Sequence, residues 1–228
     1  MDKGLRNELK YMINDIEAKS LESLLCNVMD IDPHSIKNLG YTVRSLYFDD
    51  IYNSAYYDNF YGIEPREKFR IRFYNGDTSK INLELKRKLH GKTQKSGCEI
   101  SVDQCSKLIS ETNPTFDTSL PSLFQKLCLG MMTRQLRPVV IVQYQRIPFF
   151  YTNTDVRVTI DKFIGSSIKL NTFLDRDINV HHILPTGQGI LEVKFNEFLP
   201  VEIKKILDTG RMKNISFSKY CECRRRVM

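Results

Sequence analysis

Charged and apolar residues alternate along several short segments of this sequence. Four such segments carry Lys, Arg or acidic residues at alternate positions: 68–73, 81–88, 155–161 and 191–195. Because successive side chains of a β-strand point to opposite faces, each segment as a strand presents one charged row and one apolar row. If the strands close into a barrel with the charged rows inside, they form a basic tunnel with a few carboxylates. Such a tunnel is a site for a polyanion and a divalent metal.

The competing interpretation is an ordinary antiparallel sheet whose polar face lies in water. The polar rows here contain mainly Arg, Lys and Glu, with few Ser or Thr. One such strand alone would be read as a solvated face, whereas several strands with the same pattern favour the tunnel.

The composition limits the class of protein. The chain has 228 residues, 41% hydrophobic and 27% charged, which suits one folded domain spanning 1–228. No segment approaches the roughly 20 apolar residues of a membrane-spanning helix. The charged N-terminus lacks the apolar stretch of a secretion signal, so we expect a cytoplasmic protein. The net charge of +7 favours an anionic partner without identifying it.

Residue patterns predict about eight antiparallel strands with helices between them. Strands are expected over 6–13, 41–49, 69–74, 81–89, 138–146, 156–161 and 190–195, and helices over 17–29, 103–111, 122–131, 198–207 and 217–225. Asn75-Gly76 indicates a tight turn, and Asp15 is available as a helix cap. The segment 90–97 is expected to be a mobile loop. Strands that alternate rather than run apolar predict an α+β fold, an antiparallel barrel with helices packed outside.

Motifs of common nucleotide-binding and hydrolytic sites are absent from the sequence. It contains no G-x-G-x-x-G, no G-x-x-x-x-G-K-[ST], no G-x-S-x-G and no H-E-x-x-H. A Rossmann, P-loop, serine-hydrolase or zincin site is therefore not expected.

Seven short motifs, taken in order, resemble one known family. They are Glu8-Leu9-Lys10, Lys68-Phe69-Arg70-Ile71-Arg72, Leu83-Glu84-Leu85-Lys86, Tyr144-Gln145-Arg146, Arg157-Val158-Thr159-Ile160-Asp161, Leu191-Glu192-Val193-Lys194 and Phe217-Ser218-Lys219-Tyr220. In this order they resemble the VTC domain, the catalytic domain of the vacuolar transporter chaperone polyphosphate polymerase and its bacterial relatives. That family belongs to the triphosphate tunnel metalloenzymes, or CYTH superfamily. The resemblance covers nearly the whole chain.

The resemblance implies that the terminal phosphoryl group of ATP, or another nucleoside triphosphate, is transferred to a growing inorganic polyphosphate chain. It implies catalytic wall residues that grip the phosphates: Arg70, Arg72, Lys86, Arg146, Arg157, Lys194 and Lys219. It also implies further phosphate-binding residues: Lys10, Tyr144, Ser218, Lys88, Lys92 and Lys95. Arg and Lys suit this role because Arg donates two parallel hydrogen bonds and Lys is a compact charge.

Three carboxylates are candidates for binding Mg²⁺ or Mn²⁺. Glu192 is the first choice and Glu84 and Glu8 follow, because hard cations prefer carboxylate oxygen. Glu84 with Lys86, and Glu192 with Lys194, could instead form the ion pairs that sheets commonly use. The tyrosines of segment 52–61 have the spacing of a helix face that packs on a core, and we prefer packing to base stacking.

Four functions are compatible with these residues. A polyphosphate polymerase is expected, and an inorganic triphosphatase would differ only in using water as acceptor. A polymerase needs a tunnel that is open at both ends. A non-catalytic polyphosphate-binding module would be favoured if the carboxylates were locked in salt bridges. A nucleic-acid-binding barrel is least favoured, because the alternate residues are mainly aliphatic ones that suit packing. Without a membrane segment, any export of product would need a membrane partner protein.

Overall fold

The computed structural model describes residues 3–33, 35, 40–111, 114, 117–152, 154–208 and 212–228. Within these ranges the strands are β1 (Lys3–Asn14), β2 (Asp30–Ile31), β3 (Tyr41–Asp49), β4 (Arg66–Tyr74), β5 (Asp77–Leu89), β6 (Lys92–Ile100), β7 (Arg137–Phe150), β8 (Arg157–Ser167), β9 (His181–His182) and β10 (Gln188–Phe195). The helices are α1 (Asp15–Cys26), α2 (Ser54–Phe60), α3 (Val102–Ser110), α4 (Ser122–Arg134), α5 (Val201–Leu207) and α6 (Lys219–Arg225), with a short 3₁₀ turn η2 (Leu170–Thr172).

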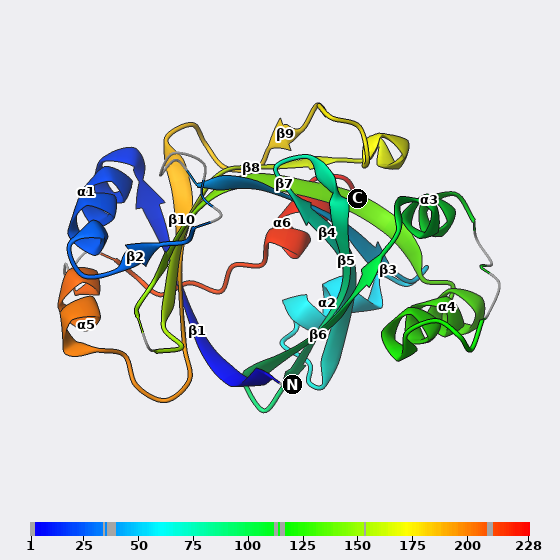
Figure 1. The fold of residues 1–228 in the computed structure, drawn as a ribbon, viewed down its shortest axis with the longest axis horizontal. Helices are drawn as coiled ribbons and strands as arrows, with labels where there is room; N and C mark the ends of the chain where they lie inside the picture. Colours follow the sequence, from blue (N-terminus) through cyan, green and yellow to red (C-terminus); the bar gives the residue numbers. More distant parts are fainter. Residues whose placement is uncertain are drawn as a thin grey trace.

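Eight of these strands close into an antiparallel barrel. Their order around the barrel is β7-β3-β4-β5-β6-β1-β10-β8, and β8 pairs back onto β7 (Figure 1). The short strands β2 and β9 extend the sheet beside β7 and β8. The predicted fold class, an α+β protein with an antiparallel barrel and helices outside it, is confirmed.

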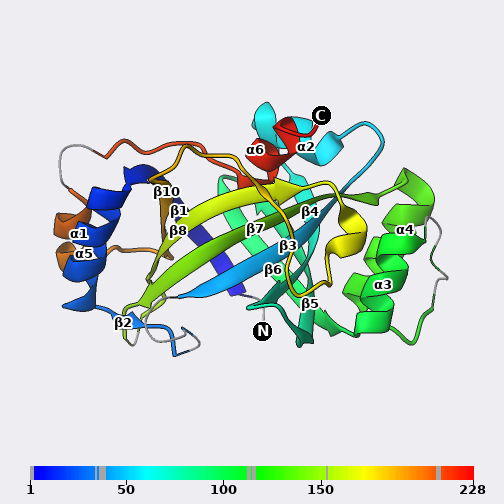
Figure 2. The ribbon, with the colours of Figure 1, turned by 90° about the horizontal axis from the view of Figure 1, so that it is seen from above.

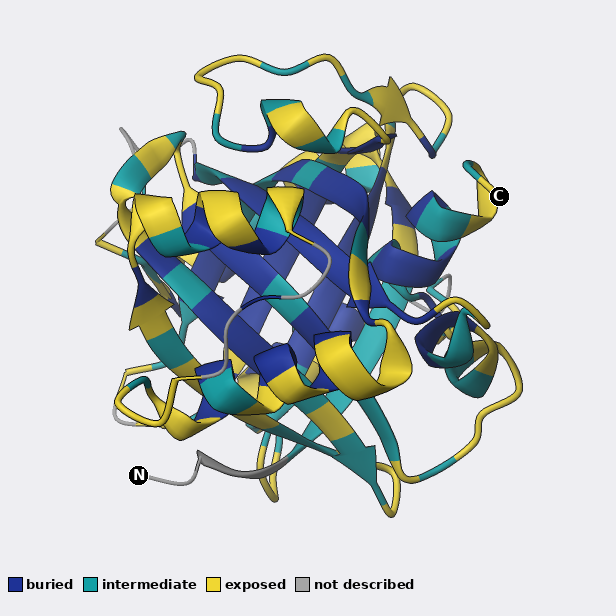
Figure 3. Ribbon diagram, turned by 90° about the vertical axis from the view of Figure 1, so that its right-hand side faces the viewer, coloured by how far each residue is buried: buried dark blue, intermediate teal, exposed yellow. Residues whose placement is uncertain are grey.

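Helices cover the outer apolar rows of the barrel on two opposite sides (Figure 1). On one side Leu25 of α1 and Ile203 of α5 pack with Val193 of β10, and on the other Leu108 of α3 packs with Leu83 of β5. Each such side chain, once buried, contributes about 1.5–3 kcal/mol relative to exposure. The alternation then turns the charged rows inward. Figure 3 shows the buried strands behind α3 and α4.

The short helices α2 and α6 lie side by side at one end of the barrel (Figure 2). The buried Asp49, at the end of β3, holds them there. Its carboxylate accepts hydrogen bonds from the backbone N–H groups of Ala55 (2.8 Å) and Tyr56 (3.1 Å) in α2, and from the Tyr220 hydroxyl in α6. Among the described residues, no helix has the length and apolarity needed to cross a bilayer.

The predicted cap of the first helix is wrong by one residue. Asn14, not Asp15, is the N-cap of α1. The Asn14 side-chain oxygen accepts from the Glu17 backbone N–H at 2.9 Å, and the Glu17 carboxylate accepts from the Asn14 N–H at 2.8 Å. This reciprocal box needs a Glu or Gln three positions after the cap, and Glu17 stands three positions after Asn14.

The prediction of a mobile loop over 90–97 is also wrong. His90 and Gly91 form a two-residue turn, both with positive φ (49° and 74°), as type I′ hairpin turns require. β6 follows at once and pairs with β5 and with β1. The polar residues suggested a loop, but Thr93 and Lys95 occupy the alternate positions that face the interior. This strand closes the barrel between β5 and β1.

Packing of the tyrosine-rich segment is confirmed only for Tyr56, which is 8% exposed. Tyr52, Tyr57 and Tyr61 are 75%, 42% and 68% exposed, so the packing prediction is wrong for them. The seven-residue helix α2 lies across the barrel end and buries one face only. On its outer face the Tyr57 and Tyr61 rings stack on each other, with centroids 6.1 Å apart.

Candidate active site

A cavity of about 420 Å³ lies inside the barrel. Among the described residues, thirteen Lys and Arg residues line it, against four Asp and Glu residues. Fifteen of the sixteen site residues proposed from the sequence are among the lining residues: Glu8, Lys10, Arg70, Arg72, Glu84, Lys86, Lys88, Lys95, Tyr144, Arg146, Arg157, Glu192, Lys194, Ser218 and Lys219. Lys92 is the exception, because it is exposed at the start of β6 and does not line the cavity.

Strand register explains why residues distant in sequence meet in this cavity. β4 and β5 pair so that Arg70 lies opposite Glu84, and β1 and β10 pair so that Lys10 lies opposite Glu192. Residues opposite each other on one face are close enough to interact. The barrel therefore converts separate alternating segments into one continuous charged wall.

Asp161 does not line the cavity but binds two residues that do, and the sequence reasoning gave it no role. Its fully buried carboxylate accepts two hydrogen bonds from Arg146, at 2.7 and 2.8 Å, and lies 2.6 Å from the Lys219 ammonium. Burial alone raises the pKa of Asp161, but Arg146 and Lys219 outweigh it and hold the pKa below its usual value. The sequence did place Asp161 at the end of the alternating segment 155–161, on its charged row. It did not show that this segment pairs with β7, which brings Asp161 opposite Arg146.

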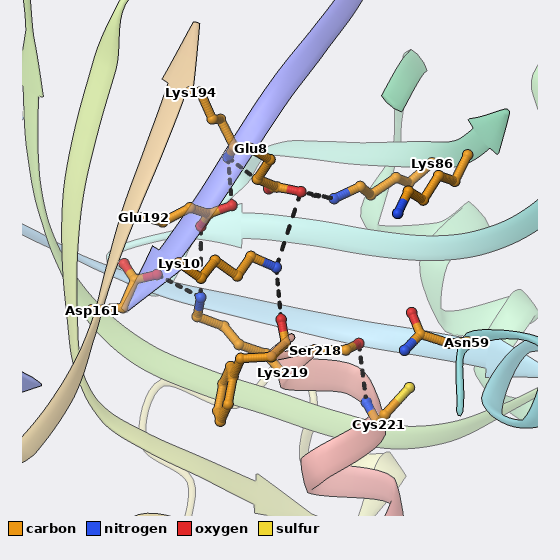
Figure 4. Close-up of polar contacts among 12 residues, drawn as sticks. Glu8, Lys10, Asn59, Lys86, Asp161, Glu192, Lys194, Ser218, Lys219 and Cys221 are labelled. Carbon is orange, nitrogen blue, oxygen red and sulfur yellow. Dashed lines mark hydrogen bonds and ion pairs between the residues drawn. The ribbon is translucent and has the colours of Figure 1, made fainter. Parts of the chain in front are cut away.

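Glu192 and Glu8 share the Lys194 ammonium, as Figure 4 shows. Lys194 Nζ lies 3.0 Å from Glu192 Oε1 and 3.7 Å from Glu8 Oε1. Glu8 also pairs with Lys86 at 3.0 Å. Burial raises the pKa of Glu192, but Lys194 and Lys219 outweigh it, so this pKa lies well below its usual value. Both carboxylates thus lie beside a common cation.

This pair of carboxylates fits a hard divalent cation. Mg²⁺ in phosphate-processing sites is usually held by one or two carboxylates, with phosphate oxygens and waters completing the shell. Glu8 and Glu192 provide that donor set. Glu84 pairs with Arg70 and Lys95, two cations that form no ion pair with Glu8 or Glu192. No group of three or more His, Cys, Asp or Glu side chains that could hold a metal occurs in the part of the chain that the structure describes.

The wall formed by β3, β4 and β5 holds two arginines in different environments. Arg70 Nε and Nη2 both lie 2.6 Å from Glu84 Oε2, and Lys95 lies 2.5 Å from Oε1 of the same carboxylate. Arg72 donates to Ser45 Oγ (2.8 Å) and to the Tyr144 hydroxyl (3.3 Å). It forms no ion pair with a described carboxylate. Its charge is therefore available to an anion in the cavity.

The segment that leads into α6 lies against the cavity at the end covered by α2. Lys10 Nζ donates to the Phe217 carbonyl at 2.7 Å, and Lys219 reaches Asp161 (Figure 4). Lys68 Nζ lies 2.8 Å from Asn59 Oδ1 and 3.4 Å from Ser218 Oγ. Sequence reasoning gave Lys68 no role, although it shares the polar row of Arg70 and Arg72.

The solved structures that match this chain include three with TM-scores above 0.5. A Bacillus halodurans protein proposed to be an adenylate cyclase matches with a TM-score of 0.55 and 14% identity, covering 94% of each chain. The Hippeastrum protein HpAC1, a proposed adenylyl cyclase reported with a dominant triphosphatase activity, matches with a TM-score of 0.58 and 13% identity, covering 99% of this chain and 96% of its own. PH1819 from Pyrococcus horikoshii matches with a TM-score of 0.51 and 15% identity, covering 98% of this chain and 99% of its own. At these identities the likeness concerns the fold alone.

A search of curated proteins finds no match to the chain. One family model, described as the VTC domain, matches residues 5–228. This range includes all seven motifs of the sequence and every strand of the barrel except the first two residues of β1. The chain therefore belongs to the VTC domain family.

Proposed function

We propose that this protein is a metal-dependent polyphosphate polymerase. It would transfer the terminal phosphoryl group of ATP, or of another nucleoside triphosphate, to an inorganic polyphosphate chain inside the tunnel. The observation that carries the proposal is the excess of cations on the cavity wall, where the described part of the chain places thirteen basic residues and four acidic ones. Membership of the VTC domain family supports the same substrate class.

The proposed mechanism depends on positioning and charge. A transferring phosphoryl group needs little covalent chemistry from the protein, so catalysis depends on orienting the phosphates and stabilising their charge. We assign phosphate binding first to Arg72 and Arg157, because neither forms an ion pair with a described carboxylate. Arg70 and Arg146 each share their charge with a buried carboxylate. Those carboxylates hold the guanidinium groups in place.

Glu8 and Glu192 would hold the divalent cation, Mg²⁺ or Mn²⁺. A bound cation neutralises phosphate charge and polarises the phosphoryl group. Lys194, which now lies beside both carboxylates, would then be free to bind a phosphate oxygen. Lys10 and Lys219 would contact the phosphates from the α6 end. The exposed Lys92 would contact a nucleotide or a chain only at the tunnel mouth.

An inorganic triphosphatase is the second candidate. It is favoured by the position of α2 and α6 at one end of the barrel (Figure 2). There the Phe217 carbonyl, just before α6, accepts a hydrogen bond from Lys10, and Lys219, the first residue of α6, pairs with Asp161. A growing chain needs an exit, whereas hydrolysis of a short triphosphate does not. The triphosphatase activity reported for the Hippeastrum neighbour supports this alternative.

A non-catalytic polyphosphate-binding module is the third candidate. Glu8, Glu84 and Glu192 each form ion pairs with lysine or arginine, which is the arrangement that would favour it. We rank it below the enzymes because substrate phosphates compete for the same cations and so would release the carboxylates.

A turnover assay distinguishes the three candidates. Purified protein is incubated with ATP and either Mn²⁺ or Mg²⁺, chains are resolved on a gel stained for polyphosphate, and free phosphate is measured in parallel. We expect chains that disappear with Glu192→Gln and persist with Glu197→Gln, a matched change at an exposed glutamate. If thermal denaturation shows that Glu192→Gln does not fold, Glu8→Gln is used in its place.

The other two outcomes are equally distinct. Free phosphate without chains would replace the polymerase by the triphosphatase. Neither product, with tripolyphosphate still raising the melting temperature, would leave the binding module.

A further inference from the structure

Lys68 differs from every other lysine that lines the cavity in the described part of the chain. The remaining six each lie within 4.0 Å of a carboxylate: Lys10, Lys86, Lys88, Lys95, Lys194 and Lys219. Lys68 forms no ion pair with a described carboxylate. Its ammonium donates to the neutral Asn59 side chain at 2.8 Å, lies 3.4 Å from Ser218 Oγ, and sits 5.6 Å from the centre of the Tyr220 ring.

The charged groups around Lys68 are mostly cations. Lys86 lies directly opposite on β5, Lys10 approaches from β1 and Arg66 precedes it on β4. Figure 4 shows Asn59, Ser218 and Lys86 at this end of the tunnel. From α6 the Cys221 thiol and the Tyr220 phenol face it, and the Tyr220 hydroxyl donates to Asp49. Asp49 at the end of β3 is already bound by Tyr220 and the backbone of α2.

These surroundings change the protonation of Lys68. Burial is the largest cause, and together with Lys86, Lys10 and Arg66 it lowers the pKa to about 7, while Cys221 acts in the opposite direction. Near neutral pH the side chain is therefore about half charged, since a group at its pKa is half protonated. An anion placed beside it would favour the charged form.

We propose that Lys68, with Lys10 and Lys86, forms a phosphate subsite at the α2–α6 end of the tunnel, and that Lys68 takes up a proton from solvent when a phosphate group binds there. The proposal rests on the proposed function in taking a triphosphate or polyphosphate as the ligand. Asn59 and Ser218 hold the Lys68 amine at the wall. The bound phosphate supplies the negative charge that no described carboxylate provides there. Protonation adds one proton to the amine nitrogen, and no other bond changes.

Binding and proton uptake are then linked. Above pH 7 the free protein must acquire a proton before Lys68 can form an ion pair, so this contribution to affinity weakens as pH rises. Between pH 6 and pH 8 the share of Lys68 that is charged in the free protein falls about tenfold. An arginine at this position would stay charged throughout, because guanidinium is not deprotonated in proteins.

Titration calorimetry with tripolyphosphate tests this coupling. Metal-free full-length protein is titrated at pH 6 and pH 8 in buffers of different ionisation enthalpy, which gives the number of protons taken up. At pH 8 we expect the wild type to take up about 0.9 proton more than Lys68→Arg, and at pH 6 about 0.1 more. The protons that the ligand itself takes up at a given pH are common to both proteins and cancel in the difference. Lys80→Arg, at an exposed site on the same hairpin, should match the wild type.

Equal proton uptake by the wild type and Lys68→Arg at pH 8 overturns the proposal. If Lys68→Arg does not fold, Lys68→Gln replaces it. That variant should lose about tenfold in affinity at pH 6 and much less at pH 8, and an unchanged affinity at pH 6 would overturn the proposal. Failure of the wild type to bind tripolyphosphate at pH 6, where Lys68 is charged, would contradict the proposed function itself and the subsite with it.

Discussion

Replacing Asp161 by Asn should destabilise this protein strongly, although Asp161 is absent from the cavity wall. Its carboxylate is fully buried and neutralises both Arg146, through two hydrogen bonds, and Lys219 at 2.6 Å. Asn keeps the shape and one acceptor oxygen but removes the negative charge. Two buried cations would then share Glu192 alone, which lies 3.2 Å from Arg146 and 3.7 Å from Lys219.

The expected loss follows from this geometry. Removing one partner of a buried ion pair reduces stability by about 3–5 kcal/mol. Because Glu192 still compensates part of the charge, we expect the lower end, about 3 kcal/mol. In a chain of this length each kcal/mol lowers the melting temperature by about 2–4 °C, so the variant should melt about 6–12 °C below the wild type.

Urea denaturation at pH 7 measures this loss, and its pH dependence checks the cause. Because the folded pKa of Asp161 is depressed, its contribution is fully present above the unfolded value of about 3.9 and is lost as pH falls through the lower folded value. The difference between wild type and variant should therefore shrink below about pH 4. Saturating tripolyphosphate should also reduce the difference at pH 7, because bound phosphate supplies negative charge to the same cations.

The control is the same substitution at a surface ion pair. Asp103 lies 3.0 Å from Lys107, and both side chains are more than half exposed. Asp103→Asn should change stability by no more than about 1 kcal/mol, as exposed pairs contribute little. If Asp161→Asn proves as stable as this control, the reasoning about the Arg146–Asp161–Lys219 cluster is refuted.

Three further predictions concern the same cavity. Arg72→Met removes a buried charge that has no described carboxylate partner, so stability in urea titrations should stay unchanged or rise. The same change should weaken tripolyphosphate binding by about 10–100-fold in calorimetry, and an unchanged affinity would exclude Arg72 from the site. Gly40→Ala should lower the melting temperature and weaken tripolyphosphate binding. Gly40 has a φ of 80°, and an added Cβ would lie 2.0 Å from the Arg146 carbonyl oxygen. A melting curve identical to that of the wild type would contradict this. The affinity for tripolyphosphate should fall steeply between low and physiological salt, and an affinity independent of salt would argue against an electrostatic site.

Much of the barrel could be predicted from the sequence because its signal is local. Alternation within segment 68–73 and the Asn75-Gly76 turn require only neighbouring residues to be read. The strand of segment 92–100 was missed because its polar residues resemble a loop. It becomes a strand through pairing with β5 and β1, which lie elsewhere in the chain. Long-range pairing of this kind leaves no local pattern.

The same distinction applies to the site. The family resemblance identified residues that now line one cavity, but it could not show which cations are already neutralised. Arg70 and Arg72 stand in the same row, yet one is paired with Glu84 and the other faces only neutral oxygens. The role of Asp161 depends on the register of β7 and β8, which places it opposite Arg146. The absence of an ion pair at Lys68 with any described carboxylate depends on its neighbours, among them Ser218 at the start of α6. These are properties of the closed barrel.

The most direct test of the account is an experimental structure of the protein with tripolyphosphate and Mn²⁺. The account predicts phosphate density inside the barrel, in contact with Arg72 and Arg157, and anomalous scattering from manganese at Glu8 and Glu192. Phosphates bound only on the outer surface, or an interior without ligand at saturating concentration, would contradict the claim that the inward charged rows form a polyphosphate site.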